Sequence, residues 1–162
     1  MAKQPSISLL DFLRTGKIGG LKLGTASKDV KRVFGASPTP REDNGRAAWV
    51  YKDLEFWINQ KTDQVYAIAI LGFSDGEPGD EFPRINHKNA LDPWIVRRNL
   101  SAEKLGKALG SAGMTFTKTV DDPAPNFETL HLESGVNIIF KLKPEAVIDA
   151  IGIHSDELAG VG

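Results

Sequence analysis

A serine motif in the sequence has the spacing of a catalytic nucleophile. Gly-Phe-Ser-Asp-Gly at Gly72–Gly76 matches the Gly-x-Ser-x-Gly elbow of hydrolases, in which a sharp turn joins a strand to a helix and exposes the serine. An apolar run precedes the motif, as the elbow requires. No helix can follow it directly, because Glu77-Pro78-Gly79 comes next and proline and glycine both interrupt helices. We therefore interpret this segment as an ordinary turn.

Histidines and carboxylates are the remaining groups that could do chemistry or hold a metal. The three histidines, His87, His131 and His154, show no pair at helix or strand spacing. Carboxylates cluster in the segment around Asp75, Glu77, Asp80 and Glu81, and carboxylate oxygens suit hard cations such as calcium. The ordered spacing of a calcium loop is missing, so we predict a solvated acidic linker, with cation binding and docking against a basic partner as the alternatives. We predict no metal and no cofactor.

Composition narrows the class of protein. The chain has 162 residues, 25% charged side chains and a formal net charge of -1, so no basic surplus favours nucleic acid or an anionic membrane surface. It contains no cysteine, which excludes disulfides and thiolate chemistry. The apolar run Val65–Phe73 is about half the length that a membrane-spanning helix needs. No secretory signal is visible at the N-terminus, and a cytoplasmic protein is the default expectation.

Two segments of the chain resemble each other in their helical pattern. Thr25–Gly35 and Leu100–Gly110 share apolar residues at i, i+3 and i+4 and end on glycine, which often terminates helices. Ser101 suits the N-cap of the second helix, and Thr25 or Ser27 that of the first. Each is preceded by another helical candidate, Ser6–Thr15 in the first half and Lys88–Arg98 in the second.

Strand patterns follow the helices in both halves. The period changes to two, and the turn signals Lys52-Asp53 and Ser134-Gly135 indicate hairpins. The apolar residues that alternate with polar neighbours are Trp49, Tyr51, Leu54, Phe56 and Ile58 in the first half, and Leu130, Leu132, Val136, Ile138 and Phe140 in the second. Last strands are expected at Gln64–Leu71 and Ala146–His154, and weaker first strands at Ser37–Asp43 and Met114–Val120.

The sequence thus predicts an α+β fold of two tandem helix-helix-antiparallel-sheet repeats. We place the first repeat at residues 1–73, a linker at 74–87 and the second repeat at 88–162. Helices should cover one face of each sheet and leave the other face open.

A family resemblance supports this organisation. Residues 21–38, followed by the aromatic strand at 49–59, resemble a small bacterial domain that occurs in outer-membrane-assembly lipoproteins and, in tandem, in the beta-lactamase inhibitor protein; similar folds occur among toxin-immunity proteins. The chain differs in having no cysteine, and therefore neither a lipidation cysteine nor the inhibitor's cysteines, and we expect no leader. The matching positions belong to the scaffold, and the resemblance implies an open sheet that grips another protein. The matching positions are Leu23, Gly24, Ser27, Val30, Gly35, Pro38, Trp49, Tyr51, Leu54 and Phe56.

Alternation also predicts which residues lie on the open face. If Leu54, Phe56 and Ile58 face the helices, their neighbours in the strand point away from them. An outward tryptophan among polar groups is typical of a binding hot spot, although a linker or a dimer partner could equally cover it. Acidic turns at the rim would steer a positively charged partner. The predicted protein-binding residues are Glu55, Trp57, Asn59 and Ile139 on the strands and Asp75, Glu77, Asp80, Asp121 and Asp122 in the loops.

These features favour a non-enzymatic protein-binding module of the cytoplasm, in its most concrete form an immunity protein or inhibitor that neutralises a bacterial toxin or enzyme by occlusion. Two alternatives stay open. One is a small enzyme with a dispersed site, such as Glu133 with His131 or Asp53 with Tyr51. The other is a self-associating structural domain in which the Trp57 face closes a homodimer.

Overall fold

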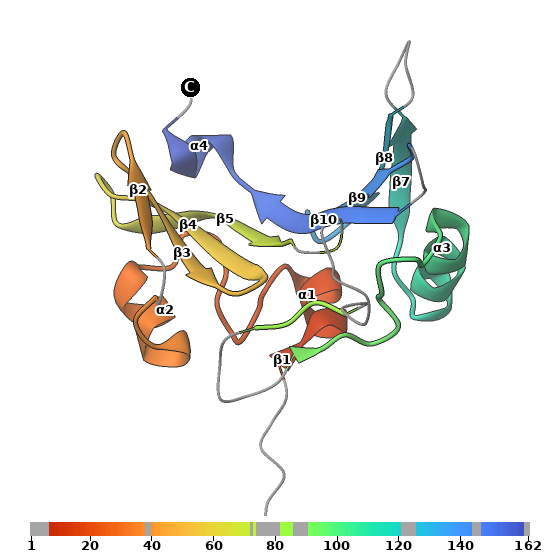
Figure 1. Ribbon diagram of the computed structural model, residues 1–162, viewed down its shortest axis with the longest axis horizontal. Helices are drawn as coiled ribbons and strands as arrows, with labels where there is room; N and C mark the ends of the chain where they lie inside the picture. Colours follow the sequence, from red (N-terminus) through yellow and green to blue (C-terminus); the bar gives the residue numbers. More distant parts are fainter. Residues whose placement is uncertain are drawn as a thin grey trace, which may run out of the picture.

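Eight strands dominate the structure, a computed structural model that describes residues 7–37, 40–71, 73, 82–85, 91–120, 126–143 and 147–160. The first half of the chain contributes β2 (Arg41–Asp43), β3 (Arg46–Tyr51), β4 (Leu54–Asn59) and β5 (Gln64–Ile70). The second half contributes β7 (Phe116–Val120), β8 (Phe127–Leu132), β9 (Asn137–Lys141) and β10 (Val147–His154). They form one antiparallel sheet in the order β2-β3-β4-β5-β10-β9-β8-β7 (Figure 1).

The predicted fold class is wrong in two respects, and the first concerns the sheets. Two tandem helix-helix-sheet repeats were expected, with no prediction of whether their sheets join. The strands β5 and β10 pair and join both halves into a single eight-stranded sheet. Ile70 lies opposite Ile151 and Ala69 opposite Gly152 at this junction. The boundaries at 1–73, 74–87 and 88–162 stay a prediction, and of the linker the structure describes residues 82–85.

The second respect concerns the helices. The described helices are α1 (Leu9–Thr15), α2 (Ser27–Phe34), α3 (Ala102–Ser111) and the four-residue α4 (Asp156–Ala159). The described part of the predicted helix Lys88–Arg98 is not helical. It begins with β6 (Leu91–Asp92), which pairs in parallel with β1 (Ile7–Ser8), and continues in turns. Pro93 disfavours helical backbone at the residue before it, and Trp94 has φ of 57°, outside the right-handed helical region.

One helix followed by four strands does occur in each half, and a β-bulge recurs at the same place in both. In the first half Trp57 lies opposite Ala67 and Ile58 opposite Val65, which leaves Tyr66 without a partner in the register. In the second half the corresponding pairs are Ile139 with Ala150 and Phe140 with Ile148, and Asp149 is left over. The residues that correspond by this alignment, Ala69 and Gly152, lie opposite each other in the central strands. The two halves of the sheet are therefore related by an approximate twofold axis at its centre.

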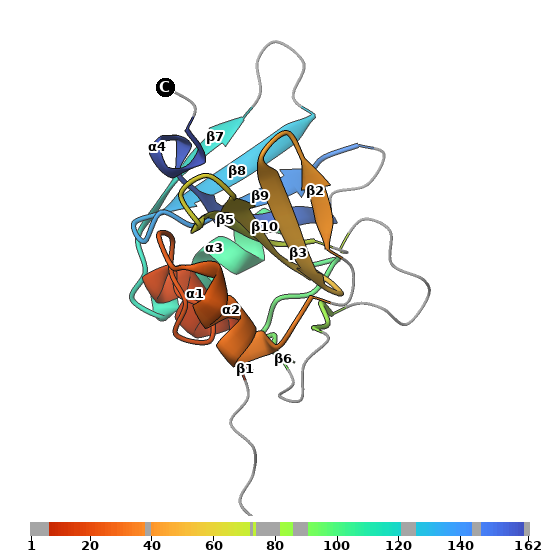
Figure 2. The same ribbon diagram turned by 90° about the vertical axis from the view of Figure 1, so that its left-hand side faces the viewer.

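The core lies on the face of the sheet that α1, α2 and α3 cover (Figures 1 and 2). Leu54, Phe56 and Ile58 are buried there, as alternation predicted for β4. The ring of Phe34 from α2 packs against the rings of Tyr51 and Phe56, with 5.4 Å and 5.3 Å between ring centroids. The opposite face is not free of helices, because α4 contacts β4 and β5 on that side. The prediction of helices on one face only is wrong to this extent.

Three of the four described helices, α1, α3 and α4, have a serine N-cap whose side chain accepts a backbone hydrogen bond, and α2 does not. Ser8 and Ser101 accept hydrogen bonds from the backbone N–H groups of Asp11 and Lys104, so the predicted cap at Ser101 is confirmed. The N-cap of α2 is Ala26, which has no side chain able to cap, so the predicted cap at Thr25 or Ser27 is wrong.

None of the described helices has the length and apolar character needed to cross a bilayer.

Tyr51 makes the stability of the folded protein depend on pH in the alkaline range. Its side chain is fully buried and its hydroxyl donates a 2.6 Å hydrogen bond to the carbonyl of Gly35. Burial raises the pKa of Tyr51 from 10.0 to about 12. The unfolded chain therefore loses this proton at lower pH than the folded protein. The contribution of the neutral Tyr51 side chain to the free energy of unfolding is fully present below pH 10 and is lost as the pH rises to about 12.

We expect the free energy of unfolding to fall between pH 10 and pH 12 by on the order of 2 kcal/mol more in the wild type than in Tyr51→Phe. Urea titrations of both proteins at the two pH values measure this difference. Burial also raises the pKa of Tyr66, but that group is present in both proteins and cancels. Equal losses in the two proteins would contradict the assignment.

Candidate functional site

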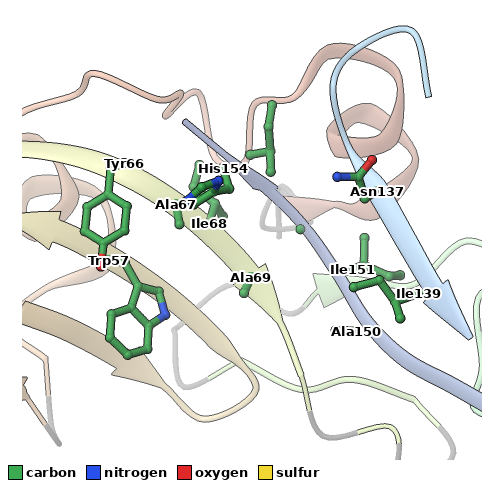
Figure 3. A pocket seen from close by; sticks show the side chains of 12 residues that line it. Trp57, Tyr66, Ala67, Ile68, Ala69, Asn137, Ile139, Ala150, Ile151 and His154 are labelled. Atoms are coloured by element: carbon green, nitrogen blue, oxygen red, sulfur yellow. The ribbon is translucent and has the colours of Figure 1, made fainter. Parts of the chain in front are cut away.

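A groove of about 430 Å³ lies on the face of the sheet opposite α1, α2 and α3, over the junction of the two halves (Figure 3). Its floor consists of Ala67 and Ala69 from β5 and Ala150 and Gly152 from β10. These side chains are a methyl group or a hydrogen atom, so the backbone of the two central strands is nearly bare. The groove exists because small residues occupy outward positions while isoleucines fill the core face of the same strands.

The two walls of the groove come from different halves of the sheet. Trp57 and Tyr66 form one wall, and Ile139 and Asn137 from β9 lie on the other side (Figure 3). His154 lies at the end of β10, with its ring edge-on to Tyr66 at 6.2 Å between ring centroids. The bulge explains the position of Tyr66. As the extra residue beside Ala67, it lines the groove next to Trp57 instead of packing in the core.

Trp57 is held in place by an ion pair between the buried Glu55 and the exposed Arg41. Its indole Nε1 donates a 3.0 Å hydrogen bond to Oε2 of Glu55, and Oε1 of Glu55 accepts a 2.6 Å bond from Arg41. The Arg41 guanidinium also lies 5.8 Å from the centre of the indole ring. Glu55 is only 7% exposed, so its carboxylate is paired with Arg41 and Trp57 instead of with bulk water. This arrangement fixes the indole orientation before any partner arrives.

The residues predicted for the strands divide into three groups. Trp57 and Ile139, which correspond in the two halves, line the same groove. Glu55 has its predicted place on β4, but its burial makes it a support for Trp57 and not an exposed contact. Asn59 donates a 3.1 Å hydrogen bond to the carbonyl of Leu158 and thereby ties α4 to the sheet.

The residues predicted for the loops all lie outside the part of the chain that the structure describes: Asp75, Glu77, Asp80, Asp121 and Asp122. The same holds for four of the five positions of the serine motif at 72–76. A basic partner steered by acidic turns therefore stays a prediction. Within the described ranges, no three His, Asp or Glu side chains gather as a metal ligand set.

The two residue pairs considered for an enzyme are not formed. Oε2 of Glu133 accepts a 2.8 Å hydrogen bond from Thr115, whereas His131 contacts Thr119 and Asn137 at 2.8 Å each. Oδ2 of Asp53 accepts from the backbone N–H of Arg84, and the Tyr51 hydroxyl is bonded to Gly35. His131 instead connects β7, β8 and β9 and fixes the amide of Asn137 at the groove.

Sequence reasoning missed Tyr66 and the whole floor of the groove. A signal for the floor was present: the last strand of each half contains Ala-Ile-Ala-Ile (67–70) or Ala-Ile-Gly-Ile (150–153). Period-two alternation of isoleucine with a methyl group or hydrogen indicates one packed face and one bare face. Tyr66 had no comparable signal, because its direction depends on the bulge.

Comparison with known proteins gave no match to a family model, to a curated protein or to a solved structure. The resemblance to the tandem inhibitor domain accordingly stays a prediction.

Proposed function

We propose that this chain is a protein-binding module that docks its partner on the face of the sheet containing the groove. In its most concrete form it is an inhibitor or immunity protein that neutralises a bacterial enzyme or toxin by occlusion. The observation that carries the proposal is the groove itself, a predominantly apolar depression that spans both halves of the sheet with an oriented tryptophan on its wall.

Physical reasons support a protein as the occupant. Binding energy at protein interfaces concentrates in a few aromatic and arginine side chains surrounded by a polar rim. Trp57 and Tyr66 line the groove, and a guanidinium lies beside each ring. Arg41 is 5.8 Å from the centre of the Trp57 ring, and Arg46 is 5.8 Å from the centre of the Tyr66 ring. Pre-ordering of Trp57 by Glu55 lowers the entropy cost of docking.

Self-association through this face is the alternative that the same observation favours, since an apolar groove can also accept a second copy of the chain. Light scattering separates the two. A monomer at the concentrations used for capture supports a foreign partner, and a dimer that Trp57→Ala dissociates supports self-association.

Trp57→Ala should weaken retention of the partner by about 30-fold, because removal of a central aromatic anchor costs about 2 kcal/mol. The measurement is affinity capture from the source lysate on immobilised wild-type and variant protein, followed by titration of the captured protein against each. Lys107→Ala is the matched control, since Lys107 is exposed on α3, away from the groove. It should retain the partner fully.

Thermal melting of both variants checks the fold. Trp57 is only partly buried, so its loss should leave the melting temperature within a few degrees of wild type. Undiminished binding by a folded Trp57→Ala protein would contradict the proposed docking face.

A further inference from the structure

The walls of the groove differ although its floor is nearly symmetric. Ala67 corresponds to Ala150, and Ala69 to Gly152, across the approximate twofold axis. The walls differ in kind. Trp57 corresponds to Ile139, and Tyr66 corresponds to Asp149, which does not belong to the groove lining. One wall is therefore aromatic and the other is aliphatic and polar, so an occupant has a single preferred orientation.

Two guanidinium groups lie beside the aromatic wall, Arg41 at the Trp57 ring and Arg46 at the Tyr66 ring. Arg41 is already neutralised by the 2.6 Å ion pair with Glu55. Arg46 is exposed, lies over Tyr66, and forms no ion pair with any described residue. An anion arriving beside Tyr66 would thus gain a partner at Arg46 without displacing an existing one.

Space and charge together define the occupant. The groove is large enough for a bulky side chain, and its lining of alanine, isoleucine and aromatic rings favours an apolar one. We propose that the partner inserts an aromatic or large aliphatic side chain over Ala67, beside Trp57 and Tyr66, and places a neighbouring Asp or Glu carboxylate on Arg46. This rests on the proposed function and adds the chemistry of the partner's contact segment: an apolar side chain with an acidic neighbour on a protruding loop.

The test uses a small mimic of that pair of groups. We expect 3-phenylpropionate to bind the full chain with a dissociation constant of about 1–10 mM, the range for so few atoms in a preformed groove. Two-dimensional ¹H–¹⁵N NMR should show shifts of the Trp57 indole N–H and of the Ala67 and Ala69 amides. The neutral 3-phenylpropanamide should bind about five times more weakly, since its amide gains no charge-assisted bond.

Variants assign that difference to one side chain. Arg46→Gln should make the acid and the amide bind equally, whereas Arg32→Gln, on the exposed side of α2, should preserve the preference for the acid. Added salt should reduce the preference, because Arg46 is exposed.

Several results would overturn the inference. Equal binding of acid and amide to the wild type would remove the carboxylate from the proposal, and shifts confined to residues outside the groove would remove the site. Binding of the free acid in the micromolar range would indicate a small-molecule site instead of a protein contact. Shifts of the same signals with protein concentration alone would indicate a second copy as the occupant. Each is distinct from failure of the proposed function, which is read from capture by Trp57→Ala.

Discussion

Ala69→Trp should reduce partner binding by about 100-fold or more while leaving the fold intact, because the new side chain occupies the space that the partner needs. Ala69 is partly exposed on the floor of the groove and its outward direction leads into about 430 Å³ of open space. Filling this space removes no core contact and breaks no hydrogen bond. Titration of the captured partner against the variant, with circular dichroism as the check of fold, measures the effect.

The matched control is Thr117→Trp. Thr117 lies on the same face of the sheet, on the edge strand β7, and is exposed away from the groove. It tests whether an added indole on this face disturbs binding without filling the groove. If both variants bind alike, whether fully or not at all, occupation of the groove is not what matters, and the site is wrong.

Gly152→Val should destabilise the protein by about 3 kcal/mol, because it separates the two central strands. A Cβ atom at Gly152 would lie 2.9 Å from the carbonyl oxygen of Ile68 and 3.6 Å from the Cβ of Ala69. The oxygen belongs to the backbone of β5, so no rotation of a flexible side chain can relieve the contact. Since β5 and β10 are the junction of the sheet, the strain falls where the two halves meet.

Urea unfolding of Gly152→Val and Ala150→Val measures this cost. Ala150 lies two positions earlier on the same strand and on the same face, and it already has a Cβ. We expect its change to valine to alter the free energy of unfolding by less than about 1 kcal/mol. Similar losses in both variants would show that β-branching on this face, and not close approach of the strands, sets the cost.

The strands of this fold were largely predictable from sequence, and their partners were not. Alternation at Leu54, Phe56 and Ile58 fixes which side chains are buried, because successive side chains of a strand point to opposite faces. The pairing of β5 with β10 joins segments about half the chain apart, and alternation contains no information about such pairing. Whether the strands of the two halves join was therefore left open by the sequence, and the structure shows them in one eight-stranded sheet.

The prediction of a helix at Lys88–Arg98 is wrong for a local reason. Apolar spacing in Lys88–Arg98 resembled a helix, but the described residues Leu91–Asp92 form a strand and Trp94 adopts a positive φ after Pro93. Proline reduces the value of periodicity as a signal for the residues before it.

The candidate site was half predictable. Trp57 and Ile139 follow from alternation and from the repeat, and both line the groove. Burial of Glu55 depends on the ion pair with Arg41, a contact between β4 and the short edge strand β2 that no spacing rule indicates. The groove as a whole depends on the pairing of β5 with β10, so it became visible only with the structure.

Photo-cross-linking in the source cells tests the docking face most directly. Benzoylphenylalanine in place of Trp57 keeps an aromatic side chain at the groove wall, and the same residue in place of Lys107 reports on α3 as the control. A discrete adduct with one other protein from position 57, absent from position 107, is the result that we expect. An adduct from position 107 alone, or no adduct from position 57 in cells where the protein still retains its partner, would contradict docking on this face.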